Sequence, residues 1–174
     1  MKKLLVVIVL AAVAVAIVAG VQANEKQEQE VLRIHIRANS DSEQDQRIKL
    51  EVRDAVVAYL TPVLAECKGL SEAKSAVAAR QSEIERRAEH VLEAAGYRYG
   101  CTVKLTREEF PARTYDGLTL EEGIYDALIV ELGDAEGANW WCVAFPPLCF
   151  LPAESEEYRS LIVEWIEKIK ERRA

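Results

Sequence analysis

The sequence is poor in histidine, and this limits the catalytic chemistry that it can carry. Its 174 residues include two histidines, His35 and His90, and four cysteines. A cysteine nucleophile needs a histidine base within hydrogen-bond reach. His35 lies between two arginines on the polar side of a predicted strand and His90 lies on a predicted helix, so we expect both to be structural or exposed. The sequence gives little support to cysteine-based catalysis.

The sequence also lacks the usual signatures of hydrolases, nucleotide-binding proteins and metalloproteins. It contains no G-x-S-x-G, no H-E-x-x-H and no Gly-rich phosphate loop. Its cysteines form neither a C-x-x-C pair nor a zinc spacing. The acidic residues between 41 and 45 suggest calcium, but the EF-hand glycine and distal glutamate are missing. We therefore predict a protein that is not an enzyme, with no catalytic residues, no metal and no cofactor.

Positive charge is scarce in the part of the chain beyond the N-terminal segment. Without Lys2 and Lys3, 20 basic and 29 acidic residues remain, a net charge of −9. Such a charge repels nucleic acid and anionic lipid. Nucleic acid is therefore excluded as an expected partner.

The N-terminus is predicted to direct export. Lys2 and Lys3 precede an unbroken apolar stretch over residues 4–21, whose length leaves a cleaved signal and a membrane anchor both open. Val21 and Ala23 place small residues at the two positions that a signal peptidase reads, which favours cleavage after Ala23, and in either case the remainder is expected to lie outside the cytoplasm. We expect a signal peptide or anchor at 1–23, a linker at 24–30 and a single exported domain at 31–174.

The exported domain begins with a predicted strand, "VLRIHIRAN". Leu32, Ile34 and Ile36 alternate with Arg33 and Arg37, which is typical of a half-buried strand.

A helix follows this strand. Residues 40–45 offer three overlapping capping pairs, so the cap residue is ambiguous. Ile48, Val52 and Val56 repeat at helical spacing, and Pro62 is expected to mark the end.

Charged residues accompany this helix, and a second helix comes after it. Asp45, Lys49 and Arg53 form an i, i+4 ladder beside the apolar stripe. Ser71 is expected to cap the second helix and Gly96 to stop it.

The remaining segments predict strands and a last helix. Residues 97–105 alternate, whereas "YDALIVELGD" is apolar on both sides and is typical of a central strand. Residues 97–145 are interpreted as a largely antiparallel run, and an amphipathic helix is expected after Ser155. The predicted fold is a single α+β domain, with a largely antiparallel sheet, two helices between its first and second strands, and a C-terminal amphipathic helix.

The segment "NWWCVAFPPLCF", residues 139–150, concentrates stiff aromatic side chains and two cysteines. Outside the cytoplasm Cys142 and Cys149 could form a disulfide if Pro146 and Pro147 bend the chain back, and a core strand with buried thiols is the alternative. For the other two cysteines, buried thiols and a second bridge stay equally open. Consecutive tryptophans face opposite sides of a strand, so one of them is a candidate for partner contact.

Three separated motifs in this order resemble one protein family. "IRANSDSEQDQRIKLEVRDAV", "FPARTYDGLTLEEGIYDAL" and "NWWCVAFPPLCF" are similar to the stage II sporulation protein R family of endospore-forming bacteria. The similarity extends from about residue 31 to residue 152. It implies a signalling protein secreted from the forespore into the space between the forespore and mother-cell membranes. There the family activates a membrane-embedded aspartic protease, which cleaves the precursor of the mother-cell sigma factor E.

The resemblance implies action by binding, with that protease as partner and with membrane contact only through an uncleaved N-terminus. The candidate partner-binding residues lie in the three motifs. They are Asn39, Ser40, Asp41, Asp45, Lys49, Arg53, Arg113, Tyr115, Asn139, Trp140, Trp141, Pro146 and Pro147. Many of them could equally be folding determinants. The alternatives from other classes are an envelope hydrolase using Cys142 or Cys149 and a structural envelope protein.

The N-terminal pattern gives a direct prediction. If residues 1–23 are a cleaved signal, N-terminal sequencing of the secreted form starts close to Asn24. Recovery of only full-length, membrane-embedded protein would show that the segment is an anchor.

Overall fold

The computed structural model describes residues 31–115 and 118–148, together with Glu167. The predicted N-terminal segment, the linker, the Asp116–Gly117 turn and the helix after Ser155 lie outside the described residues. The elements in chain order are β1 (Leu32–Arg37), α2 (Glu43–Ala65), α3 (Leu70–Ala78), α4 (Gln81–Ala94), β2 (Cys101–Phe110), β3 (Arg113–Tyr115), β4 (Leu118–Leu120), β5 (Gly123–Leu132) and β6 (Asn139–Phe145).

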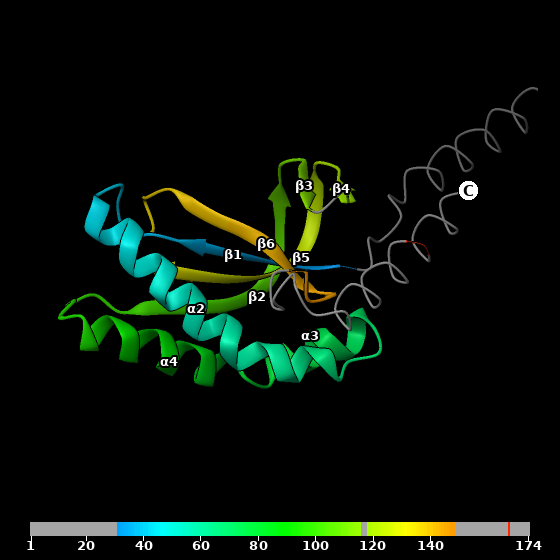
Figure 1. Ribbon diagram of the computed structural model, residues 1–174, viewed down its shortest axis with the longest axis horizontal. Coiled ribbons are helices and arrows are strands. Elements are labelled where there is room, and N and C mark those ends of the chain that lie inside the picture. The colour runs from blue at the N-terminus through cyan, green and yellow to red at the C-terminus, as the bar shows by residue number, and fades with distance from the viewer. Residues whose placement is uncertain (1–30, 116–117, 149–166, 168–174) are drawn as a thin grey trace, which may run out of the picture.

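These elements form a single α+β domain, as the sequence predicts. Strands β2, β5, β1 and β6 make one sheet in that order, and β3 and β4 pair as a separate two-stranded arm. Helices α2, α3 and α4 lie together on one side of the sheet (Figure 1). None of the helices within the described ranges is long and apolar enough to cross a membrane.

The sheet is mixed, although two of its three strand pairings are antiparallel. β1 pairs in parallel with β5 and antiparallel with β6, and β2 pairs antiparallel with β5. The expectation of one antiparallel run over 97–145 is therefore wrong in one respect, because β1 lies between β5 and β6. Three helices intervene between β1 and β2, which gives the chain room to re-enter the sheet elsewhere.

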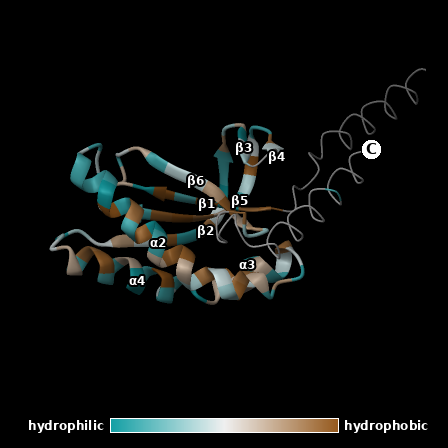
Figure 2. Cartoon of the chain, viewed as in Figure 1, coloured by the Kyte–Doolittle hydropathy of each residue, from teal (hydrophilic) through white to brown (hydrophobic). Residues whose placement is uncertain are grey.

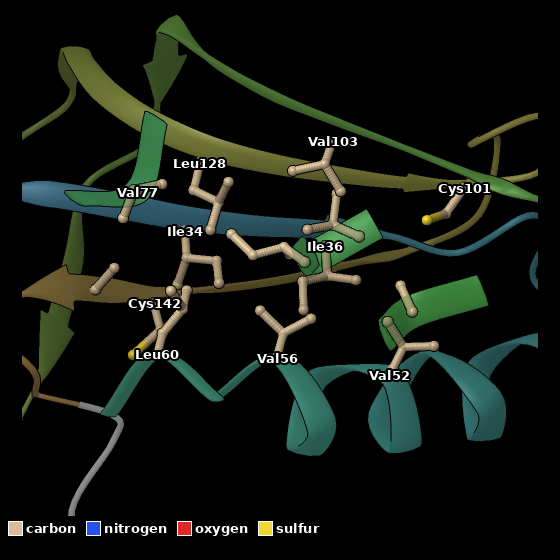
Figure 3. Packing of buried hydrophobic residues seen from close by; sticks show 14 of the residues in the cluster. Ile34, Ile36, Val52, Val56, Leu60, Val77, Cys101, Val103, Leu128 and Cys142 are labelled. Carbon is tan, nitrogen blue, oxygen red and sulfur yellow. The ribbon is translucent and has the colours of Figure 1, made fainter. Parts of the chain in front are cut away.

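The main core lies between the helices and the sheet. Val52, Val56 and Leu60 of α2 point toward Ile34 and Ile36 of β1 in Figure 3, and all five side chains are buried. Apolar side chains three to four residues apart on α2 thus pack against apolar side chains two residues apart on β1. Figure 2 shows the complementary pattern on α4, where hydrophobic and hydrophilic bands alternate along the helix.

Strand β1 is buried on both faces, so the expectation of a half-buried strand is wrong. Arg33 and His35 are both 0% exposed. They belong to the face of the sheet that turns away from the helices, where Phe110 and Ile129 lie in a second apolar cluster. An alternating polar side chain predicts solvent exposure, but in this strand aromatic neighbours cover Arg33 and His35.

Helix α2 continues past the proline that was expected to end it. Pro62 lies inside the helix, which runs to Ala65. Proline has no N–H to donate to the carbonyl one turn back. Thr61 donates its hydroxyl to the Val57 carbonyl at 2.8 Å, one residue before that position. The prediction failed because proline removes one helical hydrogen bond without compelling the chain to leave the helix.

The structure has two helices, α3 and α4, where the sequence predicts a single second helix. α3 ends at Ala78 and α4 begins at Gln81, and the N-cap of α3 is Gly69 in place of the expected Ser71. Gly96 follows α4 with a φ of +81°, as its predicted role as a stop requires. The break between the helices lets α3 and α4 pack separately on the core, through Val77 and Ile84.

The core predicts unequal effects for two leucines of α2. Leu60→Ala should lower the free energy of unfolding by about 2 to 5 kcal/mol, because Leu60 is 0% exposed and its removal leaves a cavity. Leu50→Ala is the matched control, since Leu50 is 39% exposed, and should cost about 0.5 kcal/mol. Urea denaturation of both variants measures the difference. Equal losses would contradict the assigned faces of α2.

Candidate partner-binding site

The start of α2 is built around one buried carboxylate, Asp45. It accepts hydrogen bonds from Asn39 Nδ2 at 2.9 Å, from Ser40 Oγ at 2.5 Å and from the Tyr99 hydroxyl at 2.6 Å. Its backbone N–H donates to Ser42 Oγ at 3.1 Å, so Ser42 is the cap residue that the sequence left ambiguous. Burial raises the pKa of Asp45, but these hydrogen bonds outweigh it and hold the pKa below its ordinary value.

The start of α2 and the turn before it also bind the loop that leads into β6. Asp41 Oδ1 accepts the N–H of Ala138 at 2.6 Å, and Lys49 Nζ donates to the carbonyl of the same residue at 2.9 Å. Lys49 also donates to Gln46 Oε1 at 2.6 Å. Burial lowers the pKa of Lys49, while the negative charge of Asp41 acts in the opposite direction. We call Asp41, Lys49 and Ala138 the Ala138 clamp.

Two glycines let the β5–β6 loop approach this clamp. A Cβ on Gly137 would lie 2.2 Å from the Ser40 carbonyl oxygen, and one on Gly133 would lie 2.2 Å from Asn39 Oδ1. Gly133 also has a φ of +56°, which other residues rarely adopt. Asn39 Oδ1 accepts the N–H of Asp134 at 2.9 Å. The loop and the helix start therefore fit each other through backbone contacts.

Arg53, one turn beyond Lys49, lies against the first tryptophan of β6. Its guanidinium carbon is 5.5 Å from the centre of the Trp140 ring. Arg53 also pairs with Asp54 at 2.7 Å, and Trp140 is partly buried against the helix-side core. The exposed residue before it, Asn139, begins β6.

Trp141 faces the other side of the sheet, as the strand period predicts. Its ring stacks on the His35 ring at a centroid distance of 3.7 Å and meets Phe110 edge-on at 4.9 Å. Among the described residues neither ring nitrogen of His35 has a hydrogen-bond partner, and His35 is 0% exposed. Burial, aided by the charge of Arg37, lowers the pKa of His35 from 6.5 to about 4. His35 is thus structural and neutral at pH 7, whereas His90 is exposed.

Arg113 and Tyr115 lie on the β3 strand of the arm, away from the Ala138 clamp. Arg33 of β1 donates to the Tyr115 hydroxyl at 2.9 Å and lies 4.2 Å from the centre of the Phe110 ring. Arg33 forms no ion pair with an acidic residue in the described ranges, so aromatic faces provide its main favourable contacts. Arg113 is exposed. The arm is attached to the sheet through Arg33.

The cysteines divide into two groups. Cys67 and Cys101 are free thiols, which excludes the second bridge that the sequence left open. Burial raises the pKa of the Cys101 thiol to about 12. Cys142 is disulfide-bonded. Its predicted partner Cys149 lies outside the described residues, so this pairing stays a prediction. Pro146 follows a cis peptide bond, and Leu148 donates its N–H to the Pro146 carbonyl at 2.7 Å.

Comparison with known proteins identifies the family to which this chain belongs. A family model described as stage II sporulation protein R matches residues 28–155. The chain belongs to this family. The stage II sporulation protein R of Bacillus subtilis (strain 168) is 34% identical to it over 112 residues, which is 64% of this chain and 50% of that protein. This chain therefore spans about half the length of that relative. No solved structure matches the chain.

In this member of the stage II sporulation protein R family, the first and third motifs form one unit. Asn39, Ser40, Asp41, Asp45 and Lys49 are joined by hydrogen bonds to each other or to the β5–β6 loop. The structure does not bring the arm into this unit.

Sequence reasoning missed Tyr99, Gly137 and Ala138 as members of the site. The glycine in "GDAEGAN" signalled a turn, but its close approach to Ser40 depends on tertiary structure. Within the described ranges, no group of three or more His, Cys, Asp or Glu side chains could hold a metal ion.

The buried His35 predicts a pH-dependent stability. Its pKa is about 4 in the folded chain and has the ordinary value of 6.5 when unfolded. Between these values the unfolded chain takes up a proton that the folded chain does not. The free energy of unfolding should therefore fall by about 2 to 3 kcal/mol from pH 7 to pH 4 through this residue.

Urea denaturation across this pH range tests the expectation with two variants. His35→Phe keeps a ring on Trp141 and should flatten the curve between pH 6.5 and pH 4. His90→Gln, at the exposed histidine, should leave the curve unchanged. An unchanged slope in His35→Phe would show that other groups cause the acid sensitivity.

Proposed function

We propose that this chain is a secreted sporulation signal that activates a membrane-embedded aspartic protease by binding to it. The protease then cleaves the precursor of the mother-cell sigma factor E. The observation that carries the proposal is membership of the stage II sporulation protein R family. The proposed place of action is the space between the forespore and mother-cell membranes, which fits the export pattern at residues 1–23.

The chemistry of the cysteines and histidines supports binding over catalysis. Cys142 is disulfide-bonded and so is not available as a thiolate nucleophile. Cys101 has a pKa raised to about 12, which keeps its thiol protonated at pH 7. His35 is stacked under Trp141 with both nitrogens buried. These facts weigh against the envelope hydrolase that was the main alternative.

We place the contact with the protease at Trp140 and its surroundings. Both tryptophans are partly buried, but the Trp141 ring is stacked on His35 and meets Phe110 edge-on, whereas Trp140 lies at the start of β6 under Arg53. Tryptophan and arginine are the residues most often found at interface hot spots. β6 also holds this ring on a rigid strand, which lowers the entropy cost of binding.

Co-expression tests the proposed class of function. The chain is produced with the candidate protease and its sigma precursor in a host that does not sporulate, and precursor cleavage is scored. Cleavage that requires this chain and no other sporulation protein supports the proposal. Absence of cleavage, with all three proteins present in the membrane and exported fractions, would favour a structural envelope role.

The proposed contact predicts that Trp140→Ala separates activation from folding. The variant should stay folded and lose about 2 kcal/mol of binding, over tenfold in affinity. Trp141→Ala should instead lower the free energy of unfolding by about 3 kcal/mol or more, because Trp141 covers His35. Thermal unfolding and precursor cleavage are measured for both.

Ile124→Ala provides the matched control. Ile124 is an apolar side chain that is 62% exposed on β5. Its replacement should change neither the melting temperature nor cleavage. If Trp140→Ala activates as well as the unaltered chain, the docking surface lies elsewhere, and the arm carrying Arg113 becomes the next place to look.

A further inference from the structure

The charged ladder of α2, made of Asp45, Lys49 and Arg53, is largely turned toward the protein. Asp45 and Lys49 are 6% and 5% exposed, so the i, i+4 spacing turns two of its three members toward the protein. Lys49 and Arg53 contact the loop before β6 or β6 itself, whereas Asp45 contacts the turn after β1. Asp45 orders the Asn39–Ser40 turn, Lys49 holds Ala138, and Arg53 covers Trp140.

The register of β6 on β1 determines which face of the sheet each tryptophan occupies. Within the described ranges β6 pairs on one side only, with β1, and the pairing is regular from Arg33–Val143 to Arg37–Asn139, with a shift of register at the other end of β6, between Leu32 and Arg33. A slip of one residue would exchange the faces of Trp140 and Trp141. The start of β6 therefore needs a second constraint besides the β1 ladder.

The Ala138 clamp has the geometry to provide this constraint. Asp41 in the turn before α2 accepts the N–H of Ala138, and Lys49 of α2 donates to its carbonyl, so both backbone groups of Ala138 have partners at this end of the helix. Ala138 immediately precedes β6 and lies two residues before Trp140. Figure 1 shows the start of α2 and the loop before β6 at the same end of the sheet.

We propose that Asp41, Lys49 and Arg53 are positioning residues that fix the register of β6 and present Trp140 to the protease. This proposal rests on the proposed function for its biological meaning. The first two fix the backbone through Ala138, and the guanidinium of Arg53 fixes the Trp140 ring. Residues of the first family motif then position the tryptophan of the third.

The test uses the exported chain as recovered after secretion, with two readouts. The first is the NMR resonances of the Trp140 and Trp141 indole N–H groups, assigned through single Trp→Phe variants. The second is the concentration of chain that gives half-maximal cleavage of the sigma precursor in membranes containing the protease.

Lys49→Met retains the apolar stem and removes both hydrogen bonds of the ammonium group. It should shift the Trp140 indole resonance and raise the half-maximal concentration about tenfold. Lys49→Arg, which keeps donors at this position, should restore much of both. In a Trp140→Ala background Lys49→Met should cause no further loss of activation.

Lys74→Met is the matched control on α3. It removes the Lys74–Asp126 ion pair of 2.7 Å, which ties a helix to β5 and does not touch β6. It should leave the indole resonances and the half-maximal concentration unchanged, whatever it does to the melting temperature. If Lys74→Met and Lys49→Met act alike, the clamp is ordinary folding stability and the proposal is wrong.

Two further variants keep the test decisive. If Lys49→Met does not fold, Arg53→Gln removes the cation over Trp140 from a partly exposed site and carries the same expectation for the resonance. Asp41→Ala removes the acceptor for the N–H of Ala138 and should shift the Trp140 indole resonance, as Lys49→Met does. Unshifted indole resonances in both Lys49→Met and Arg53→Gln overturn the positioning role. Shifted resonances with normal activation would keep that role and overturn the contact at Trp140.

Discussion

The burial of β1 on both faces is the constraint on which the rest of this structure depends. Ile34 and Ile36 face the helices, while Arg33 and His35 face the aromatic cluster of the other side. A strand in this position must have neighbours on both edges, and β5 and β6 supply them. Because β1 runs directly into the turn before α2, the start of that helix is brought to the end of the sheet where β6 begins.

This placement gives the polar residues of the first motif their role. The turn after β1 and the loop before β6 pair directly, since the N–H groups of Glu136 and Gly137 donate to the carbonyls of Asn39 and Ala38. Asp41 and Lys49 add partners for the N–H and the carbonyl of Ala138. The arm is held at the other end of β1, where Arg33 donates to the Tyr115 hydroxyl. Single residues of β1 and its flanking turn thus connect all three family motifs.

The sequence was sufficient for the elements whose periodicity is unbroken. The central position of β5 followed from apolar residues on both sides, and the opposite faces of Trp140 and Trp141 followed from the strand period. Prediction failed where polar side chains are buried by partners far away in the sequence, as for Arg33 beside Phe110. It also failed at Pro62, whose local effect the rest of α2 outweighs.

The motifs of the sequence indicate candidate residues but not how these residues meet in space. The motifs drew attention to Asn39, Asp45 and Lys49, yet nothing local reveals that Lys49 reaches a carbonyl 89 residues away. Tyr99 carried no signal of its own, because its hydroxyl meets Asp45 only after β2 joins the sheet. Spacing along one helix predicted a charged ladder beside the apolar stripe, and tertiary structure buries two of its members, Asp45 and Lys49.

The central claim is that this chain acts on a protease by contact. Its most direct measurement adds the purified exported chain to vesicles that hold only the protease and the sigma precursor, at the face of the membrane outside the cytoplasm. The account predicts that precursor cleavage rises and saturates with the amount of chain added, and that the chain itself is recovered unchanged. Cleavage that is independent of the chain, or none at any concentration, would contradict it.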